Sequence, residues 1–252
     1  MSVLVLALVA GAVVGLALGA LGGGGSVLAV PALIYLLGFT PAAATTASLL
    51  IVAATTATSL YAHARAGHVR WRAGAAFAAA GLLPAALAGA AATRLPQPVL
   101  TAAFAAVAAL AAVAALAAVR MLRPATAAPK EVRPLKAAGT GAGLGALTGL
   151  LGVGGGFLAV PALVTVLAFE MQAAVGTSLL VITTNSLASL MTRTGGAADL
   201  DWAVVAPFAG AAILGAWDGR RLAAKVSGAR LQQVFAVLLL GVAAVMLVDA
   251  VA

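Results

Sequence analysis

The stretch LGGGGSVLAVPAL, residues 21–33, recurs almost unchanged as LGVGGGFLAVPAL at residues 151–163. A shift of 130 positions superimposes the two copies, and the alignment continues without a gap for about fifty residues. The hexapeptide LAVPAL is identical in both, and ASLL at 47–50 matches TSLL at 177–180. The chain therefore consists of two related halves, each with a run of glycines inside an apolar stretch.

The composition is that of a membrane protein. Of the 252 residues, 64% are hydrophobic and 8% are charged, too few charges to cover the outside of a water-soluble domain. Apolar runs of about 20 residues, the length that crosses a bilayer as a helix, recur along the chain. They do not alternate as β-barrel strands would. The net charge is +8, but the basic residues lie in short loops and form no basic face interleaved with aromatic residues, which argues against nucleic-acid binding.

Each half contains five apolar segments, and we expect an all-α polytopic membrane protein. Its parts are a first repeat at 1–119, a cytoplasmic linker at 120–136 and a second repeat at 137–252. The segments lie at about 2–21, 26–38, 42–62, 73–92 and 99–119, and at about 137–151, 157–169, 171–191, 203–216 and 231–251. The first two segments of each repeat include pieces of about 13 residues, too short to cross without tilt or thinning. We therefore expect eight to ten transmembrane helices, with 26–38 and 157–169 either crossing or re-entrant.

The loops predict opposite orientations for the two repeats. The loop after the third segment is basic in the first half (63–72) but carries two aspartates in the second (192–202); the loop after the fourth is nearly neutral at 93–98 and basic at 217–230. Because Lys and Arg gather in cytoplasmic loops, we expect the basic loops and the linker 120–136 inside the cell and both termini outside, in the inner (plasma) membrane. Such inverted repeats are typical of secondary transporters, whose substrate site lies near the midplane.

The glycine runs form the first candidate site. A helix that starts inside the membrane after such a run directs unpaired N–H groups and the positive end of its dipole into the protein, which suits an anion. The candidate residues are Gly24, Gly25 and Ser26 in the first half and Gly154, Gly155 and Gly156 in the second. A tight turn between packed helices, with no ligand, explains the same glycines.

An earlier series of glycines occurs at four-residue spacing in both halves. Its members are Gly11, Gly15 and Gly19 in the first half and Gly141, Gly145 and Gly149 in the second. Small residues four apart let helices approach closely in a membrane. We interpret the series as static packing rather than as a sliding surface.

A polar stripe forms the second candidate site. In each half, three polar residues at spacings of seven and four residues lie on one face of the third segment. They are Ser48, Thr55 and Ser59 in the first half and Ser178, Asn185 and Ser189 in the second, and Thr45 and Thr177 extend the polar surface near the upstream ends. Hydroxyl and amide groups can replace water around an oxyanion without carrying a net charge. Ser and Thr also bond to carbonyls of their own helix or hold neighbouring helices together, and this alternative stays open.

Ionisable residues are missing from the interior of the predicted spans, because they all lie in loops or at segment ends. Proton relays, cation sites and intramembrane proteases need such residues within the span. The sequence therefore disfavours a metal site and an enzyme, calls for no cofactor, and predicts a small anion as the partner besides the lipid bilayer. Arg65 and Arg193, at the ends of the third segments, could attract or gate anions but are interpreted as interfacial residues.

The sequence resembles the TauE/SafE family of membrane permeases. The resemblance rests on GALGGGGSVLAVPAL (19–33), GLLGVGGGFLAVPAL (149–163) and AVGTSLLVITTNSLAS (174–189), within a duplicated architecture that covers essentially the whole chain. It implies movement of small sulfur-containing anions such as sulfite or organosulfonates. One departure is Thr46, where the second half has Gly176.

The function predicted from the sequence is secondary transport of a small oxyanion by alternating access between inverted repeats. Two rivals stay open. A channel for small anions or solutes would conduct without coupling, and a membrane scaffold or assembly protein would tolerate substitutions in the polar stripe. A homo-oligomer is also left open.

Overall fold

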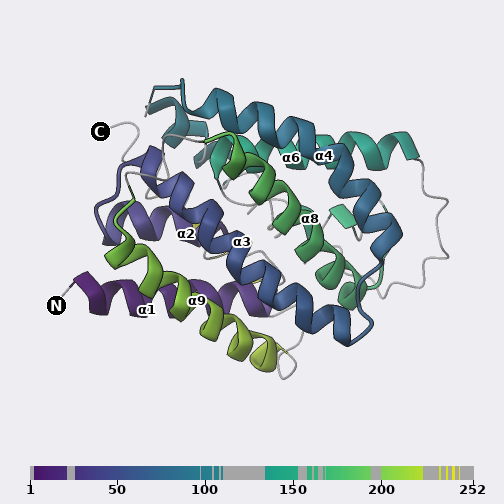
Figure 1. Ribbon diagram of the computed structural model, residues 1–252, viewed down its shortest axis with the longest axis horizontal. Helices are drawn as coiled ribbons and strands as arrows, with labels where there is room; N and C mark the ends of the chain where they lie inside the picture. Colours follow the sequence, from purple (N-terminus) through teal and green to yellow (C-terminus); the bar gives the residue numbers. More distant parts are fainter. Residues whose placement is uncertain are drawn as a thin grey trace.

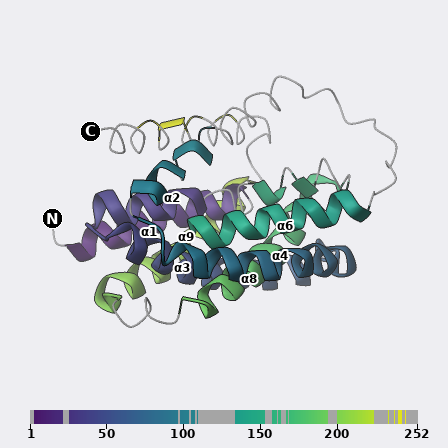
Figure 2. The same ribbon diagram turned by 90° about the horizontal axis from the view of Figure 1, so that it is seen from above.

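The computed structural model is mainly helical, with short turns between the helices and no strand in the part of the chain that it describes. It describes residues 3–21, 26–96, 98–103, 105–107, 109, 134–152, 158–160, 162–163, 167, 169–193 and 200–223, and the single residues 233, 237, 240, 241 and 244. The elements are α1 (Val3–Leu21), α2 (Ser26–Pro31), the π-helix η1 (Ala32–Leu36), α3 (Pro41–Arg65), α4 (Trp71–Ala92), α6 (Pro134–Leu151), α8 (Met171–Met191) and α9 (Trp202–Ala223). Figures 1 and 2 show the long helices lying alongside one another.

Five of these helices are long and apolar enough to cross a membrane, namely α1, α3, α4, α8 and α9. The predicted class, an all-α polytopic membrane protein, is confirmed. The predicted segment 171–191 coincides with α8, whereas α9 runs to Ala223, beyond the predicted end at 216. The extra residues of α9 include an exposed ion pair between Asp218 and Arg221 at 3.5 Å. Most of the predicted segments 99–119 and 231–251, and of the linker 120–136, lies outside the described residues.

The helix after the first glycine run is too short to cross a membrane by itself. The helix that begins at Ser26 continues as η1 and ends at Leu36. Eleven residues of helix extend about 16 Å, roughly half of a 30 Å hydrocarbon core. Pro31 lies inside this segment and has no N–H to donate to the hydrogen bonds of an α-helix. The backbone changes to π-helical geometry directly after it, at Ala32. Of the two alternatives left open for 26–38, these lengths favour the re-entrant one.

Two pairs of helices pack with their backbones in contact. On α1, Gly11, Gly15 and Gly19 meet Phe208, Ala212 and Ala216 of α9; on α6, Gly141, Gly145 and Gly149 meet Phe77, Gly81 and Ala85 of α4. A Cβ atom at any of these six glycines would collide with the facing backbone. The close packing predicted for both glycine series is confirmed.

These contacts also fix the directions of the helices. In each pair, residues with higher numbers on one helix contact residues with higher numbers on the other. Helix α1 is therefore parallel to α9, and α6 is parallel to α4. The contacts of α8 with α4 advance in the same way, so these two helices are parallel as well. Residues 66–70 turn the chain back between α3 and α4. The helices α3 and α8, which align at an offset of 130 residues, therefore run in opposite directions, as Figure 1 shows.

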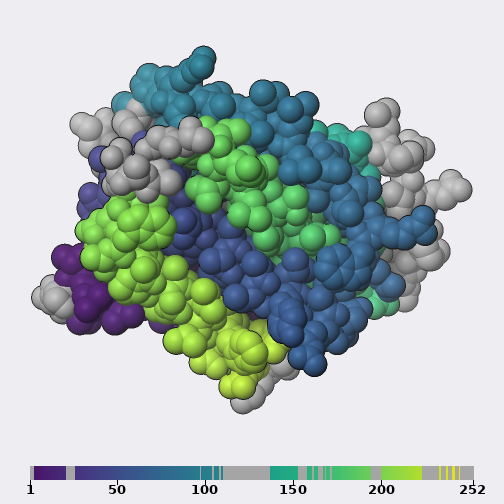
Figure 3. All heavy atoms as spheres, viewed as in Figure 1, coloured from purple at the N-terminus to yellow at the C-terminus, as the bar shows by residue number. Residues whose placement is uncertain are grey.

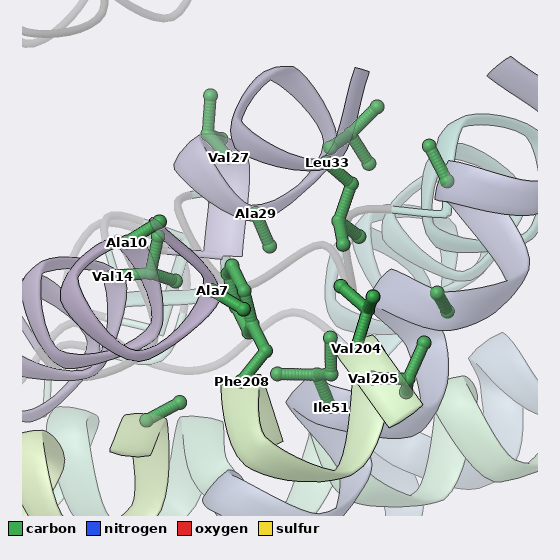
Figure 4. Packing of buried hydrophobic residues seen from close by; sticks show 14 of the residues in the cluster. Ala7, Ala10, Val14, Val27, Ala29, Leu33, Ile51, Val204, Val205 and Phe208 are labelled. Carbon is green, nitrogen blue, oxygen red and sulfur yellow. The ribbon is translucent and has the colours of Figure 1, made fainter. Parts of the chain in front are cut away.

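The buried apolar side chains form two clusters. Figure 4 shows the first, in which Phe208 of α9 and Ile51 of α3 pack among residues of α1 and α2. The second joins Val52 of α3 to residues of α4, α6 and α8, among them Phe77 and Ile182. Neighbouring residues of α3 thus belong to different clusters, which places this helix between the two.

The predicted inversion can be tested by labelling, because the chain contains no cysteine. We expect Ala66→Cys, in the exposed loop before α4, to react with a membrane-impermeant maleimide only from the cytoplasmic side. Ala197→Cys, in the loop that the sequence predicts at 192–202, should react only from the outside. Labelling of both single-cysteine variants from the same side of intact cells would contradict the inverted topology.

Candidate functional site

The candidate polar residues lie on the two innermost spans. In α3, 61% of the membrane span is buried, and in α8 56%, against 33% in both α1 and α4. On the face shown in Figure 3, α3 and α8 lie between α9 and α4. Most polar side chains on these two helices are therefore enclosed by protein.

In α8, the polar stripe packs against glycines of α4. The pairs are Thr177 with Gly74, Asn185 with Gly81 and Ser189 with Gly89. In addition, the Thr177 hydroxyl accepts a hydrogen bond from the backbone N–H of Arg70 at 3.0 Å. All three polar residues are at most 1% exposed. The predicted face of α8 is thus a buried face, and the glycines of α4 make room for it.

The stripe on α3 lies apart from that on α8. Thr55 follows Ile51 by one turn, on the face of α3 that packs in the first cluster, and its hydroxyl donates to the Ile51 carbonyl at 2.7 Å. Ser48 is fully buried and Ser59 is half-buried. Ser178 also bonds to its own helix, through the Val175 carbonyl at 2.8 Å. Thr55 and Ser178 therefore bond to carbonyls of their own helices, which is the alternative to ligand binding given in the sequence analysis.

Sequence reasoning missed the polar contact between α3 and α8. The hydroxyls of Thr56 and Thr183 lie 2.8 Å apart, and each also bonds to a carbonyl one turn earlier. Beside this contact, α3 and α8 enclose a groove of about 290 Å³. Its lining is four apolar residues of α3 together with Thr183, Leu187 and Leu190 of α8. An apolar lining of this kind does not suit an anion, so we do not assign the substrate to this groove.

Several buried oxygen atoms have no hydrogen-bond partner within the described part of the chain. They are Oγ of Ser26, Ser48, Ser186 and Ser189 and Oδ1 of Asn185. Four of these five residues were predicted as site residues from the sequence; Ser186, one position beyond Asn185, was not. Buried polar atoms are ordinarily paired, so each unpaired one on a membrane-embedded helix is a candidate contact for a ligand.

The glycine runs are described only at their edges. Gly24, Gly25, Gly154, Gly155 and Gly156 lie outside the described residues, so the structure does not test them. The last described residue before the second run is Gly152, which ends α6 with φ +67° and donates its N–H to the Thr148 carbonyl at 3.0 Å. A side chain there would be strained by this φ and would also collide with Thr45 of α3.

Arg193 is the functional candidate that the sequence analysis placed wrongly. It was interpreted as an interfacial residue, but it is 4% exposed. Its guanidinium donates to Thr45 Oγ1 at 2.8 Å and to the Gly149 carbonyl at 2.6 Å, and its Nε has no partner among the described residues. Burial lowers the pKa of Arg193 to about 10, so the side chain keeps its charge at neutral pH. By contrast, Arg65 is exposed beside Tyr61, as expected for an interfacial residue.

These features define a polytopic α-helical membrane protein with buried polar residues between its packed spans. The chain matches the family described as sulfite exporter TauE/SafE over residues 7–246. Two relatives from Xylella fastidiosa, strains 9a5c and Temecula1, are each described as a probable membrane transporter protein. They are 34% and 33% identical over 251 residues, which cover 95% of this chain and 93% of each relative.

The chain therefore belongs to the TauE/SafE family of membrane transporters. This family is one of transporters rather than enzymes. No solved structure matches the chain.

Proposed function

We propose that the protein is a secondary transporter that carries a small oxyanion, such as sulfite or an organosulfonate, across the plasma membrane. The observation that carries this proposal is the presence, among the described residues, of unpartnered, buried polar groups on the inner helices α3 and α8. The hydroxyls of Ser48 and Ser189 can donate to an oxyanion, and the amide of Asn185 carries N–H donors beside its unpartnered Oδ1. Leaving polar atoms unpaired inside a membrane protein is costly, and a transported solute can complete their hydrogen bonds.

The charges favour an anion over a cation. The described spans contain no acidic side chain except Asp218, near the end of α9, where it is exposed. Cation sites in membranes are usually built from carboxylates. Hydroxyl groups, amide N–H groups and the buried guanidinium of Arg193 are instead hydrogen-bond donors that suit the oxygens of an anion.

Alternating access is supported by how the helices are grouped. Backbone contacts hold α1 to α9 and α4 to α6, so each pair can move as a unit. Between the inner helices α3 and α8 lie the Thr56–Thr183 contact and the apolar groove. The opposite directions of α3 and α8 suit a carrier whose two halves exchange roles as the site opens to either side. We infer that the α1–α9 pair and the α4–α6 pair, each of which joins one helix from either half of the sequence, move against each other along this seam.

A panel of radiolabelled solutes tests the proposal. The purified protein, reconstituted in liposomes, is expected to take up sulfite, thiosulfate or taurine in a saturable manner. Uptake should be measured with and without a pH gradient to detect coupling to protons. Empty liposomes serve as the control, and sulfate measures selectivity. If the protein accelerates the entry of none of these solutes, the proposed function is contradicted.

A further inference from the structure

Arg193 carries a buried positive charge between the two halves of the molecule. It follows α8 directly, and its two hydrogen bonds reach Thr45 in the first half and Gly149 in the second. Thr45 is itself 4% exposed and contacts Gly152 at the end of α6. The guanidinium thus lies where α3, α6 and the end of α8 meet.

This charge has no acidic counterpart in the described part of the chain. The ion pair found there joins Asp218 and Arg221 at the surface, and no described carboxylate lies within ion-pair distance of Arg193. A buried cation without an opposite charge is strongly disfavoured. The negative end of the α6 dipole, presented by the Gly149 carbonyl, offsets only part of that cost.

The guanidinium also keeps free donor capacity. Arginine has five N–H donors in a planar fork that matches two oxygens of an oxyanion. Two hydrogen bonds occupy Nη1 and Nη2, while Nε is buried without a partner among the described residues. Within the part of the chain that the structure describes, the Arg193 guanidinium thus lacks a negatively charged partner and an acceptor for its Nε–H, and an oxyanion supplies both.

We propose that Arg193 binds the transported oxyanion, with Thr45 beside it; this inference rests on the proposed function and assigns the charge-recognising residue of that same path. The equivalent position in the first half, 130 residues earlier, is His63. A buried arginine at this position therefore exists once in the chain, and we expect one high-affinity oxyanion site per chain rather than two.

The competing explanation is structural, because a cation that bonds to the last carbonyls of a helix also stabilises that helix. Arg193→Gln separates the two roles. The amide keeps donors for Thr45 and Gly149 but removes the charge and the fork. Arg193→Lys keeps the charge without the fork. Arg65→Gln is the matched control, since Arg65 is exposed at the end of α3.

The test measures two quantities for each variant: the KM for radiolabelled sulfite uptake in liposomes, and the rise in thermal midpoint that sulfite gives the purified protein. For Arg193→Gln we expect the KM to rise about ten- to hundredfold, as for the loss of a charged hydrogen bond. Sulfite at 100 times its dissociation constant should raise the wild-type midpoint by roughly 5–10 °C, and this rise should disappear in the variant. Arg193→Lys should fall between the two, and Arg65→Gln should match the wild type.

The outcomes separate this inference from the proposed function. An Arg193→Gln protein with lower stability, but with an unchanged KM and an unchanged response to sulfite, would overturn the inference and leave oxyanion transport standing. If the glutamine variant does not fold, Arg193→Lys provides the test instead. An unchanged KM and an unchanged response to sulfite in the lysine variant would overturn the inference in the same way. Wild-type protein that is stabilised by sulfite through Arg193 but moves no solute would overturn the proposed function and support the site. Wild-type protein that sulfite does not stabilise would overturn the site.

Discussion

Replacing Gly145 with alanine is expected to lower the thermal midpoint of the protein by roughly 2–8 °C. The added Cβ would collide with the backbone of Gly81 on α4, so the two helices would have to separate. Overpacking of a core costs about 1–3 kcal/mol, and here the obstacle is backbone that cannot change rotamer. The better helix propensity of alanine returns about 1 kcal/mol at most. The midpoint can be measured by size-exclusion chromatography of detergent-solubilised protein after heating.

Gly143 provides the control for this prediction, two residues away on the same helix. A Cβ at Gly143 would have no heavy atom within 4 Å, and the residue is exposed. Gly143→Ala should therefore leave the midpoint unchanged or raise it slightly. Equal effects of the two substitutions would show that helix propensity, rather than backbone contact between α4 and α6, sets the response.

Replacing Asn185 with leucine is expected to reduce oxyanion uptake at least tenfold while the folded protein persists. The Asn185 side chain is 1% exposed, and its Oδ1 has no partner in the described part of the chain. Removing an unpaired buried polar group does not sacrifice a hydrogen bond, so stability should change little. If leucine proves too large beside Gly81, Asn185→Ala removes the same amide without the added bulk.

Thr184 is the matched control for Asn185, because it is the adjacent residue and its hydroxyl already donates to the Leu180 carbonyl at 2.8 Å. Thr184→Val should preserve uptake. Unchanged uptake in a well-folded Asn185→Leu protein would mean that the polar stripe of α8 only packs against α4. The ligand hypothesis for the stripe would then fail, whatever the role of Arg193.

The membrane class and the inner helices could be predicted from the sequence because their signals are local. Apolar runs of span length mark the helices, and Thr40 followed by Pro41 marks the start of α3, where the Thr40 hydroxyl accepts from the Ala43 N–H. The buried face of α8 followed from the seven- and four-residue spacing of its polar residues. Its neighbour could also have been inferred, since Gly74, Gly81 and Gly89 form a row on one face of α4.

The burial of Arg193 could not be predicted in this way. The arginine follows directly after a span, as interfacial arginines do, and nothing in its neighbouring residues distinguishes it. Its burial comes from Thr45 and Gly149, which are 148 and 44 residues away in the sequence and reach it only through the packing of α3 and α6. The Thr56–Thr183 contact was missed because both residues lie beside the predicted stripes, on the faces where α3 and α8 meet.

The central claim, that the protein is an oxyanion carrier, is tested most directly by counterflow. Liposomes containing the protein are loaded with unlabelled sulfite, and the entry of radiolabelled sulfite from outside is followed at several concentrations. A carrier with alternating access predicts saturable entry that is faster when the internal sulfite can be exchanged. Entry that rises linearly with concentration, is indifferent to internal sulfite and is accompanied by a steady ionic current would show a channel and contradict the account.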